Sequence, residues 1–461
     1  MNGYPQSLLL NTEDLGFATD FYQLTMAAAY HAMESMPRGT FELFVRHLPP
    51  HRNFLIFAGL EQALASLQEL RFSPEQVSYL RGLPQFEQIG DDFFEVLASF
   101  RFQGDIWAMA EGTAFFPYEP VMRVEGSLLE AQLVETLLLS TINFQSAIAS
   151  KAARIRLSAG SEVHLAEFGS RRAHGPQAGT WVARAAFLAG FDSTSNVLAG
   201  QRLGIPIVGT MGHSYILAFD SEVEAFGHYQ QQFPRHSVHL VDTFDSLEGV
   251  RQALETGRPF EAIRLDSGDL KTLAQGSREL LDAHGRQDVK IFGSGDLDEW
   301  KVRRLLGLGA PIDSFGVGTR LAALSDAPFL GGVYKLVELN REGQRSPRAK
   351  FSASKSTFPW PKQVYRRFRE GFMAGDALLR ADEAPEGDEQ AVPLLHRVME
   401  RGKLVDIPDG DESGGLSLHS LEKAKQNCRL QLEQLPSPLK LLGASAFPYR
   451  VEIAASLRNN R

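Results

Sequence analysis

The chain has 461 residues, of which 43% are hydrophobic and 22% are charged, so it is long enough for two or three globular domains. Its formal net charge is -9, and no block of lysines and arginines indicates a nucleic-acid or membrane partner. The single cysteine, Cys428, excludes an intrachain disulfide and a metal site made of several cysteines.

The sequence shows no targeting or membrane segment. Residues 1–11 lack the charged start and apolar core of a signal peptide. The longest uncharged run of the most apolar segment, residues 136–150, is too short to span a bilayer and contains Asn143 and Gln145. We therefore expect a soluble, cytoplasmic protein.

The N-terminal part alternates between helical and extended patterns. Apolar residues at helical spacing follow Thr19 and Asp20, which are suitable helix caps. The expected elements are a helix within 15–33, a strand at 40–46, a helix at 54–70 and a strand at 105–110. These patterns predict a mixed α/β domain over residues 1–125.

A long helix is expected over residues 128–157, with an interruption near Ser140, and a regular alternation of strands and helices follows it. The expected strands are 163–167, 205–208, 238–241, 262–265, 289–292 and 314–317. The expected helices are 179–189, 194–201, 247–255, 270–284 and 297–308. This rhythm favours a closed or nearly closed β/α barrel over residues 126–335, and an open doubly wound sheet is the alternative.

One tetrapeptide occurs twice, as Ser267-Gly268-Asp269-Leu270 and as Ser294-Gly295-Asp296-Leu297. Each copy follows an expected strand and precedes an expected helix. Helix capping alone would account for the Ser and Asp residues. Two copies at successive strand ends instead favour a phosphate-binding rim, because glycine lets the backbone approach an anion.

The last part of the chain, residues 336–461, is expected to return to the N-terminal domain and to add a helical extension. A strand is predicted at 331–339 and a helix at 418–435, with Ser420 as its cap. The tail from Ala446 is expected to be short and extended, and it shows no chemistry.

Polar residues follow every expected strand of the barrel, and the loops after the strands share one face of such a barrel. Arginines there would clamp carboxylates or phosphates, glycine-rich ends with Ser or Thr would cradle phosphate, and aspartates would hold Mg²⁺ on a pyrophosphate. The residues on this face are Arg171, Arg172, His174, Thr210, His213, Asp242, Thr243, Arg264, Asp266, Ser267, Asp269, Ser294, Gly295, Asp296, Gly316, Gly318, Thr319 and Arg320. The set suits a phosphorylated sugar that meets a smaller acid.

With these residues assembled, the chain resembles the nicotinate phosphoribosyltransferase family. The matching stretches are 19–26 (TDFYQLTM), 41–46 (FELFVR), 167–176 (EFGSRRAHGP), 190–196 (GFDSTSN), 209–214 (GTMGHS), 264–270 (RLDSGDL) and 332–337 (GVYKLV). The resemblance implies an irregular β/α barrel of the type II phosphoribosyltransferase kind with an additional N-terminal α/β domain. It also implies ATP-coupled transfer of phosphoribosyl from phosphoribosyl pyrophosphate to nicotinate.

The resemblance assigns roles to single residues. His213 would be phosphorylated by ATP, and Tyr22, Arg171, Thr210 and Arg264 would bind nicotinate. The residues that would bind the phosphoribosyl group and its phosphates are Arg172, Asp266, Ser267, Gly268, Ser294, Gly295, Gly316, Gly318 and Thr319. Asp266 and Asp296 would hold Mg²⁺. The resemblance further implies a homodimer with shared active sites, in which Tyr22 acts across the dimer. Gly212 departs from the alanine expected beside His213.

Three other functions remain open at this point. The nearest are phosphoribosyltransferases for nicotinamide or for quinolinate. The third is a non-catalytic barrel that senses phosphoribosyl pyrophosphate. His213 favours catalysis, because binding alone does not need an imidazole.

Overall fold

The computed structural model describes residues 10–350, 355–385, 387, 390–405 and 420–458. The chain forms two compact units, one made of residues 1–146 with 329–461 and the other of residues 147–328. The first boundary lies inside the continuous helix α6 (Glu135–Ala159), whereas the sequence placed it at residue 126. No helix in the described part of the chain has the length and apolar character needed to cross a bilayer.

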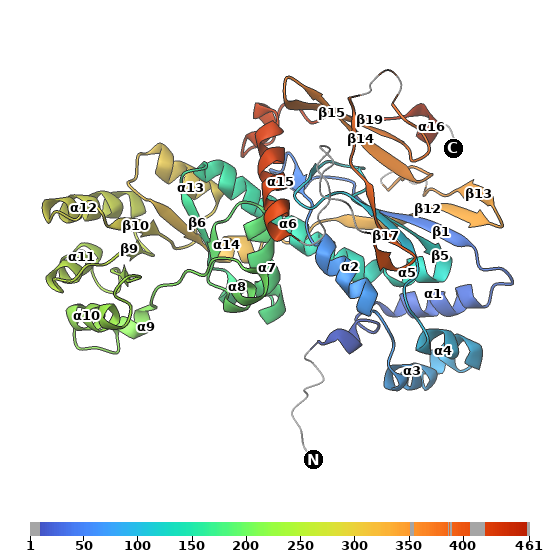
Figure 1. The fold of residues 1–461 in the computed structure, drawn as a ribbon, viewed down its shortest axis with the longest axis horizontal. Helices are drawn as coiled ribbons and strands as arrows, with labels where there is room; N and C mark the ends of the chain where they lie inside the picture. Colours follow the sequence, from blue (N-terminus) through green and yellow to red (C-terminus); the bar gives the residue numbers. More distant parts are fainter. Residues whose placement is uncertain (1–9, 351–354, 386, 388–389, 406–419, 459–461) are drawn as a thin grey trace, which may run out of the picture. The chain divides into compact units, whose positions relative to one another are not determined.

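The first unit is built on a seven-stranded antiparallel sheet with the order β13-β12-β1-β5-β3-β17-β18 (Figure 1). Its strands are β1 (Arg38–Val45), β3 (Asp105–Ala108), β5 (Met122–Ser127), β12 (Gly332–Arg341), β13 (Gln344–Pro347), β17 (His396–Glu400) and β18 (Lys403–Leu404). Strand β1 lies in the interior of the sheet, between β12 and β5, and is buried along its length beyond Arg38. The strands predicted at 40–46, 105–110 and 331–339 are confirmed.

The C-terminal part also contributes a four-stranded sheet that the sequence pattern did not reveal. Its order is β16-β14-β15-β19, with β14 (Lys362–Arg369), β15 (Phe372–Arg380), β16 (Val392–Pro393) and β19 (Val451–Ile453). Arg366 and Asp376 pair across β14 and β15 and are fully buried, so charged residues occupy core positions and conceal the apolar alternation. The predicted helix is confirmed as α15 (Leu421–Gln434), which Ser420 caps.

Two helix predictions in the first unit need correction. The helix expected over 54–70 is wrong in its first half, where β2 (Leu55–Ile56) pairs with β4 (Ala114–Phe115). Gly59, with φ 102°, separates this strand from α2 (Leu60–Glu69). The interruption expected near Ser140 is also wrong, because the break falls at Val134, between α5 (Leu128–Leu133) and α6.

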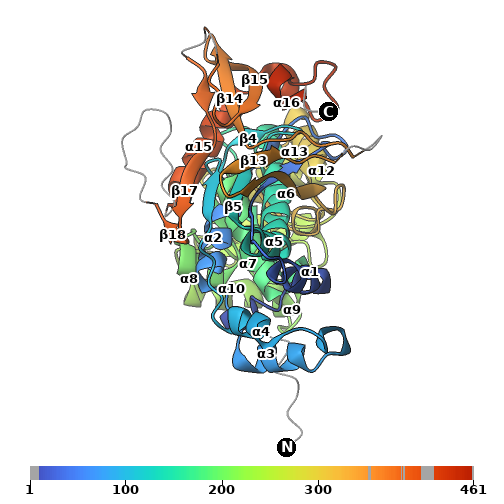
Figure 2. The same ribbon diagram turned by 90° about the vertical axis from the view of Figure 1, so that its right-hand side faces the viewer.

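The remaining helices of the first unit are short. They are α1 (Phe21–His31), α3 (Pro74–Arg81), α4 (Asp91–Ala98), α16 (Ala455–Arg458) and the 3₁₀ turns η2 (Thr12–Asp14), η3 (Pro84–Phe86) and η5 (Ser437–Lys440). Helices α3 and α4 lie side by side, and α16 lies beside β15 (Figure 2).

The second unit carries a parallel six-stranded sheet with the order β7-β6-β11-β10-β9-β8. Its strands are β6 (His164–Glu167), β7 (Ser193–Thr194), β8 (Val238–Leu240), β9 (Ala262–Leu265), β10 (Lys290–Gly293) and β11 (Ser314–Val317). Its helices after α6 are η4 (Ser170–Arg172), α7 (Pro176–Leu188), α8 (Val197–Leu203), α9 (His213–Ile216), α10 (Glu222–Gln232), α11 (Ser246–Glu255), α12 (Leu270–Ala283), α13 (Glu299–Gly307) and α14 (Thr319–Ala322).

The expected β/α barrel is present as a half-barrel, since β7 and β8 are the two edges of the sheet in the described chain. The strand predicted at 205–208 is wrong. Only an isolated bridge joins Ile207 to Thr194, because Pro206 has no N–H to continue a ladder. The helix predicted from Thr194 begins instead at Val197, capped by Asn196.

Candidate active site

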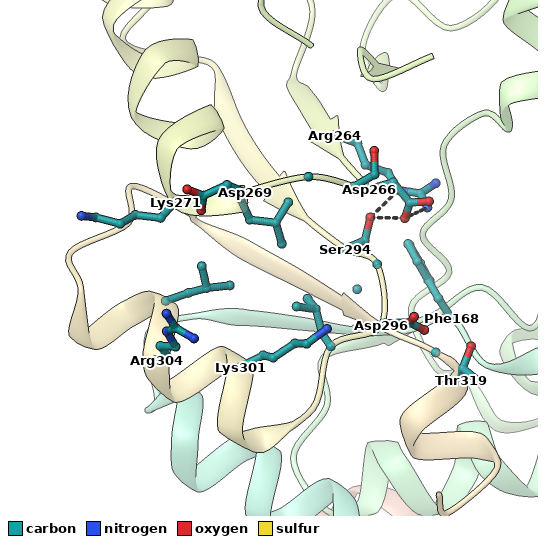
Figure 3. A pocket seen from close by; sticks show the side chains of 18 of the residues that line it. Phe168, Arg264, Asp266, Asp269, Lys271, Ser294, Asp296, Lys301, Arg304 and Thr319 are labelled. Atoms are coloured by element: carbon teal, nitrogen blue, oxygen red, sulfur yellow. Dashed lines mark hydrogen bonds and ion pairs between the residues drawn. The ribbon is translucent and has the colours of Figure 1, made fainter. Parts of the chain in front are cut away.

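Arg264 is the centre of a hydrogen-bonded network at the carboxyl ends of β9 and β10 (Figure 3). Its Nη1 donates to Thr210 Oγ1 at 3.0 Å, its Nε to Ser294 Oγ at 2.9 Å and its Nη2 to Asp266 Oδ1 at 2.7 Å. The guanidinium also lies 5.5 Å from the ring centroid of Phe168. These contacts fix the plane of the guanidinium before any ligand arrives.

Asp266 is ionised in this network. Burial raises the pKa of its carboxyl, but the charge of Arg264 and the hydrogen bond from Ser294 together bring the pKa below its ordinary value. Ser294 Oγ donates to Asp266 Oδ1 at 2.6 Å. The strand ends therefore present a paired cation and anion, with the serine hydroxyl between them.

His213 is connected to the same strand ends through Asp242, which follows β8. The side chain of Asp242 is 1% exposed, and its Oδ1 lies 3.4 Å from Nε2 of His213. Its Oδ2 accepts from Ser267 Oγ at 2.6 Å and from the backbone N–H of Asp266 at 3.1 Å. The imidazole begins α9 and is 45% exposed, so it is held on one side and open on the other.

A cavity of about 860 Å³ opens beside this network, within the second unit. Most of the predicted site residues line it: Arg171, Arg172, Arg264, Asp266, Ser267, Gly268, Ser294, Gly295, Asp296, Gly316, Gly318 and Thr319. Arg171 and Arg172 have no ion-pair partner among the described residues, so both charges are available to a ligand. The structure thus brings these residues together around one cavity, while the role of each residue and the ligand stay predictions.

Gly295 is required where β9 and β10 end. Its φ is 93°, and a Cβ atom on it would overlap the carbonyl oxygen of Asp266. Only glycine fits this contact, because an L side chain is disfavoured at this φ and has no space. Close approach of the two loops keeps their backbone groups beside the cavity.

Helix capping does not explain the repeated Ser-Gly-Asp-Leu. Asp269 occupies the N-cap of α12 but makes no capping hydrogen bond, and its carboxylate accepts from Thr272. The second copy does not begin a helix as expected, because α13 starts at Glu299 and Asp298 caps it. The two serines instead join neighbouring strand ends, Ser267 to Asp242 and Ser294 to Asp266.

Three of the residues to which the resemblance assigns a role do not line the cavity. Thr210 contacts Arg264, and His213 contacts Asp242, so both belong to the adjoining network. Tyr22 lies in the first unit, where its hydroxyl donates to Glu135 at 3.2 Å. Burial and the charge of Glu135 raise the pKa of Tyr22 to about 12, so its hydroxyl stays protonated at neutral pH.

The sequence reading missed several cavity residues. Phe168 follows β6 directly, and an aromatic residue at a strand end is a usable signal for a ligand surface. Lys271, Lys301 and Arg304 are carried by helices α12 and α13. No local pattern distinguishes them from other surface cations, since only the rotation of each helix directs them to the cavity.

The carboxylates of the cavity fit Mg²⁺ only together with a substrate. No group of three or more His, Cys, Asp or Glu side chains suited to a metal occurs in the described part of the chain. Asp266 and Asp296 both line the cavity. Magnesium commonly binds through one or two carboxylates plus substrate phosphates, and this pair offers that arrangement.

Comparison with known proteins gives a consistent result. Residues 17–143 match the family model for the nicotinate phosphoribosyltransferase N-terminal domain. A nicotinate phosphoribosyltransferase of Mycobacterium tuberculosis is 42% identical over 95% of this chain and 91% of its own, and one of Bacillus subtilis is 41% identical over 84% and 80%.

Two solved structures are similar over nearly the whole chain. Human nicotinic acid phosphoribosyltransferase superposes with a TM-score of 0.80 at 29% identity, covering 95% of this chain and 98% of that one. Nicotinate-nucleotide pyrophosphorylase from Pyrococcus furiosus superposes with a TM-score of 0.73 at 26% identity, covering 94% and 98%.

Proposed function

Since the chain belongs to the nicotinate phosphoribosyltransferase family, we propose that it transfers phosphoribosyl from phosphoribosyl pyrophosphate to nicotinate. The products are nicotinate mononucleotide and pyrophosphate, in NAD salvage, and we place the reaction in the cytoplasm. One observation carries the proposal: the Arg264 network borders a cavity lined by arginines, serines and glycines. Such groups bind carboxylate and phosphate oxygens.

Nicotinate would lie against Arg264, whose guanidinium Thr210 and Phe168 hold in place. Arg171 adds positive charge for the carboxylate of the ring. Tyr22, protonated and oriented by Glu135, would complete this pocket from a second copy of the chain, which makes the active enzyme a homodimer. An orienting pocket accelerates the reaction because the ring nitrogen must face C1 of the ribose.

The sugar donor would occupy the glycine-lined part of the cavity. Gly316, Gly318 and Thr319 would bind one phosphate through backbone N–H groups and a hydroxyl, with Arg172 as counter-charge. Ser267, Gly268, Ser294 and Gly295 present similar donors from the neighbouring loops. Transfer passes through a state with positive charge on the ribose, and these donors stabilise the departing pyrophosphate.

Asp266 and Asp296 would hold Mg²⁺ against the pyrophosphate oxygens. When bound, Mg²⁺ neutralises the negative charge that develops on the leaving group. Asp266 suits this role because it is ionised at neutral pH.

His213 would accept the γ-phosphoryl group of ATP, with an N–P bond formed, the P–O bond to ADP broken and the phosphoryl group later released to water. Because Asp242 faces Nε2, it would hold a proton on that nitrogen and leave Nδ1 free as the acceptor. The phosphorylated imidazole adds an anion beside Ser267, which would change the affinity of the neighbouring loops for substrate and product.

Turnover with competing acids tests this function. The enzyme should release pyrophosphate with nicotinate, and ATP should stimulate the rate. Faster turnover with nicotinamide or quinolinate would assign it to another pyridine substrate. Binding of phosphoribosyl pyrophosphate without turnover would make the chain a sensor.

A further inference from the structure

The 3₁₀ turn η4 carries two exposed cations of the cavity, Arg171 and Arg172. We call Ser170–Arg172 the arginine turn. Within it, the backbone N–H groups of Arg172 and Ala173 donate to the carbonyl oxygen of Gly169 at 2.8 and 3.0 Å. A turn this short is not stable by itself, so contacts from outside must hold the two charges in place.

Glu167, the last residue of β6, fixes the start of the arginine turn. Its side chain is fully buried, and one carboxylate oxygen accepts from the backbone N–H of Gly169. The other oxygen accepts from Thr194 Oγ1 at 2.6 Å. No lysine or arginine of the described chain pairs with this carboxylate, and a buried charge without a cation costs folding free energy. Because both of its hydrogen bonds lead to loops of the site, Glu167 serves the site rather than the stability of the core.

Thr194, in the edge strand β7, connects Glu167 to a second support of the turn. Its hydroxyl donates to Glu167 and accepts from the backbone N–H of Asn196 at 3.0 Å. The side-chain amide of Asn196 donates to Ser170 Oγ at 2.9 Å, while its oxygen caps α8. The arginine turn is therefore held at Gly169 and at Ser170, and the two supports meet at the hydroxyl of Thr194.

The backbone of Thr194 is fixed independently of its side chain. Its N–H donates to the carbonyl oxygen of Pro206, and its own carbonyl oxygen accepts from the N–H of Val208, both at 3.0 Å. The chain then continues to His213. One threonine thus joins the loop that carries the two arginines to the loop that carries His213.

We propose that Glu167 and Thr194 are positioning residues, which hold the arginine turn so that both guanidinium groups face the anionic substrates. The inference rests on the proposed function, which gives Arg171 and Arg172 their substrates. Neither Glu167 nor Thr194 lines the cavity, so both act through the turn. Guanidinium groups bind carboxylates and phosphates in planar two-point contacts, which a shifted turn would break.

Thr194→Val tests the proposal, because it removes the hydroxyl and keeps the shape of the side chain. KM for nicotinate and for phosphoribosyl pyrophosphate should each rise about tenfold, while kcat changes less than about threefold. Thr194→Ser keeps the hydroxyl and should keep both KM values within about twofold of the wild type. Unchanged KM values in Thr194→Val, whatever its kcat, would overturn the proposal.

Ser193→Ala is the matched control. It removes a buried hydroxyl of the same strand, one that contacts His164 instead of Glu167. Both KM values should stay at the wild-type level in this variant. Tenfold rises here as well would show that any damage to β7 has the same effect, and would overturn the assignment to Thr194.

Hydrogen exchange tests the support of the turn without any substrate. The backbone amides of residues 169–173 should exchange about tenfold faster in Thr194→Val than in the wild type, and at the wild-type rate in Ser193→Ala. An unchanged rate in Thr194→Val would overturn the proposal. Since this measurement needs no turnover, a wild type that makes no nicotinate mononucleotide would refute the proposed function and leave the exchange result valid.

Discussion

Oδ1 of Asp242 lies 3.4 Å from Nε2 of His213, and no hydrogen-bond partner satisfies this buried oxygen in the described structure. The other oxygen of Asp242 holds Ser267 and the backbone of Asp266. One carboxylate therefore connects the exposed imidazole to the loop after β9. A change of charge on His213 therefore changes the electrostatic potential at the loop where the substrate phosphates are expected to bind.

Replacement of Asp242 by Asn should uncouple ATP hydrolysis from phosphoribosyl transfer. The amide keeps the shape but loses the charge that orients the imidazole, so the ATP-stimulated rate should fall about 10- to 100-fold. ATP-independent transfer should persist, as it should in His213→Ala. The measurement is ADP formed per nicotinate mononucleotide.

Asp245→Asn is the control for that variant. Asp245 is a nearby carboxylate that caps α11, and asparagine caps helices equally well. Wild-type coupling in Asp242→Asn would refute the role of Asp242, and normal coupling in His213→Ala would refute that of His213.

Replacement of Arg264 by Ala should mainly affect nicotinate. The guanidinium is the fixed cation of the expected acid pocket, so KM for nicotinate should rise about 10- to 100-fold, and far more than KM for phosphoribosyl pyrophosphate. The variant also removes the charge that lowers the pKa of Asp266, so that pKa should rise. Steady-state kinetics measures the first effect; equal increases in both constants would argue against an acid-binding role.

Replacement of Gly295 by Ala should damage both stability and activity. The new Cβ overlaps the carbonyl of Asp266, so the loop must move, and we expect a loss of about 2–4 kcal/mol in the free energy of unfolding. Gly309→Ala is the control, with a similar positive φ of 68° and open space around it. It should lose only about 1 kcal/mol. Similar losses in both variants, measured by urea unfolding, would contradict the packing argument.

His239 should make the protein sensitive to mild acid. Burial lowers its pKa to about 3, so the folded form stays neutral while the unfolded chain takes up a proton near the ordinary value of about 6.5. Below pH 6.5 the unfolded state binds more protons, and stability falls by about 1.4 kcal/mol per pH unit down to the folded pKa. The contribution is fully present above pH 6.5.

His239→Phe tests this pH dependence. The ring of His239 packs against Phe226 and Phe260 in the core, so an aromatic replacement keeps most of the packing. Urea unfolding at pH 7 and pH 5 should show a smaller loss of stability in the variant than in the wild type. An identical loss in both proteins would show that another group is responsible.

The sequence predicted which residues lie at the barrel rim because residues that directly follow parallel strands lie on one face of the sheet. Arg264, Asp266, Ser294 and Gly295 come from short apolar strands whose loops share one face, and the structure brings them together. The same rule placed Asp242 on that face. Its contact with His213 could not be predicted, because it depends on the path of the loop before α9.

Other features depend on long-range packing and left no local signal. Arg366 and Asp376 form a buried ion pair across two neighbouring strands. A charged residue in a sequence normally indicates an exposed position, so neither residue predicts this buried placement unless the pairing is already known. Lys301 and Arg304 reach the cavity only through the rotation of α13. The edge strand β7 is two residues long, too short for any periodicity.

The most direct test of the account is the stoichiometry of one reaction that contains nicotinate, phosphoribosyl pyrophosphate, ATP and Mg²⁺. We predict that nicotinate mononucleotide, pyrophosphate and ADP accumulate in equal amounts, and that acid-labile phosphate is found on His213 when the sugar donor is omitted. Formation of the nucleotide with no ADP and no phosphorylated His213 would contradict it, as would ATP hydrolysis that continues without nicotinate mononucleotide.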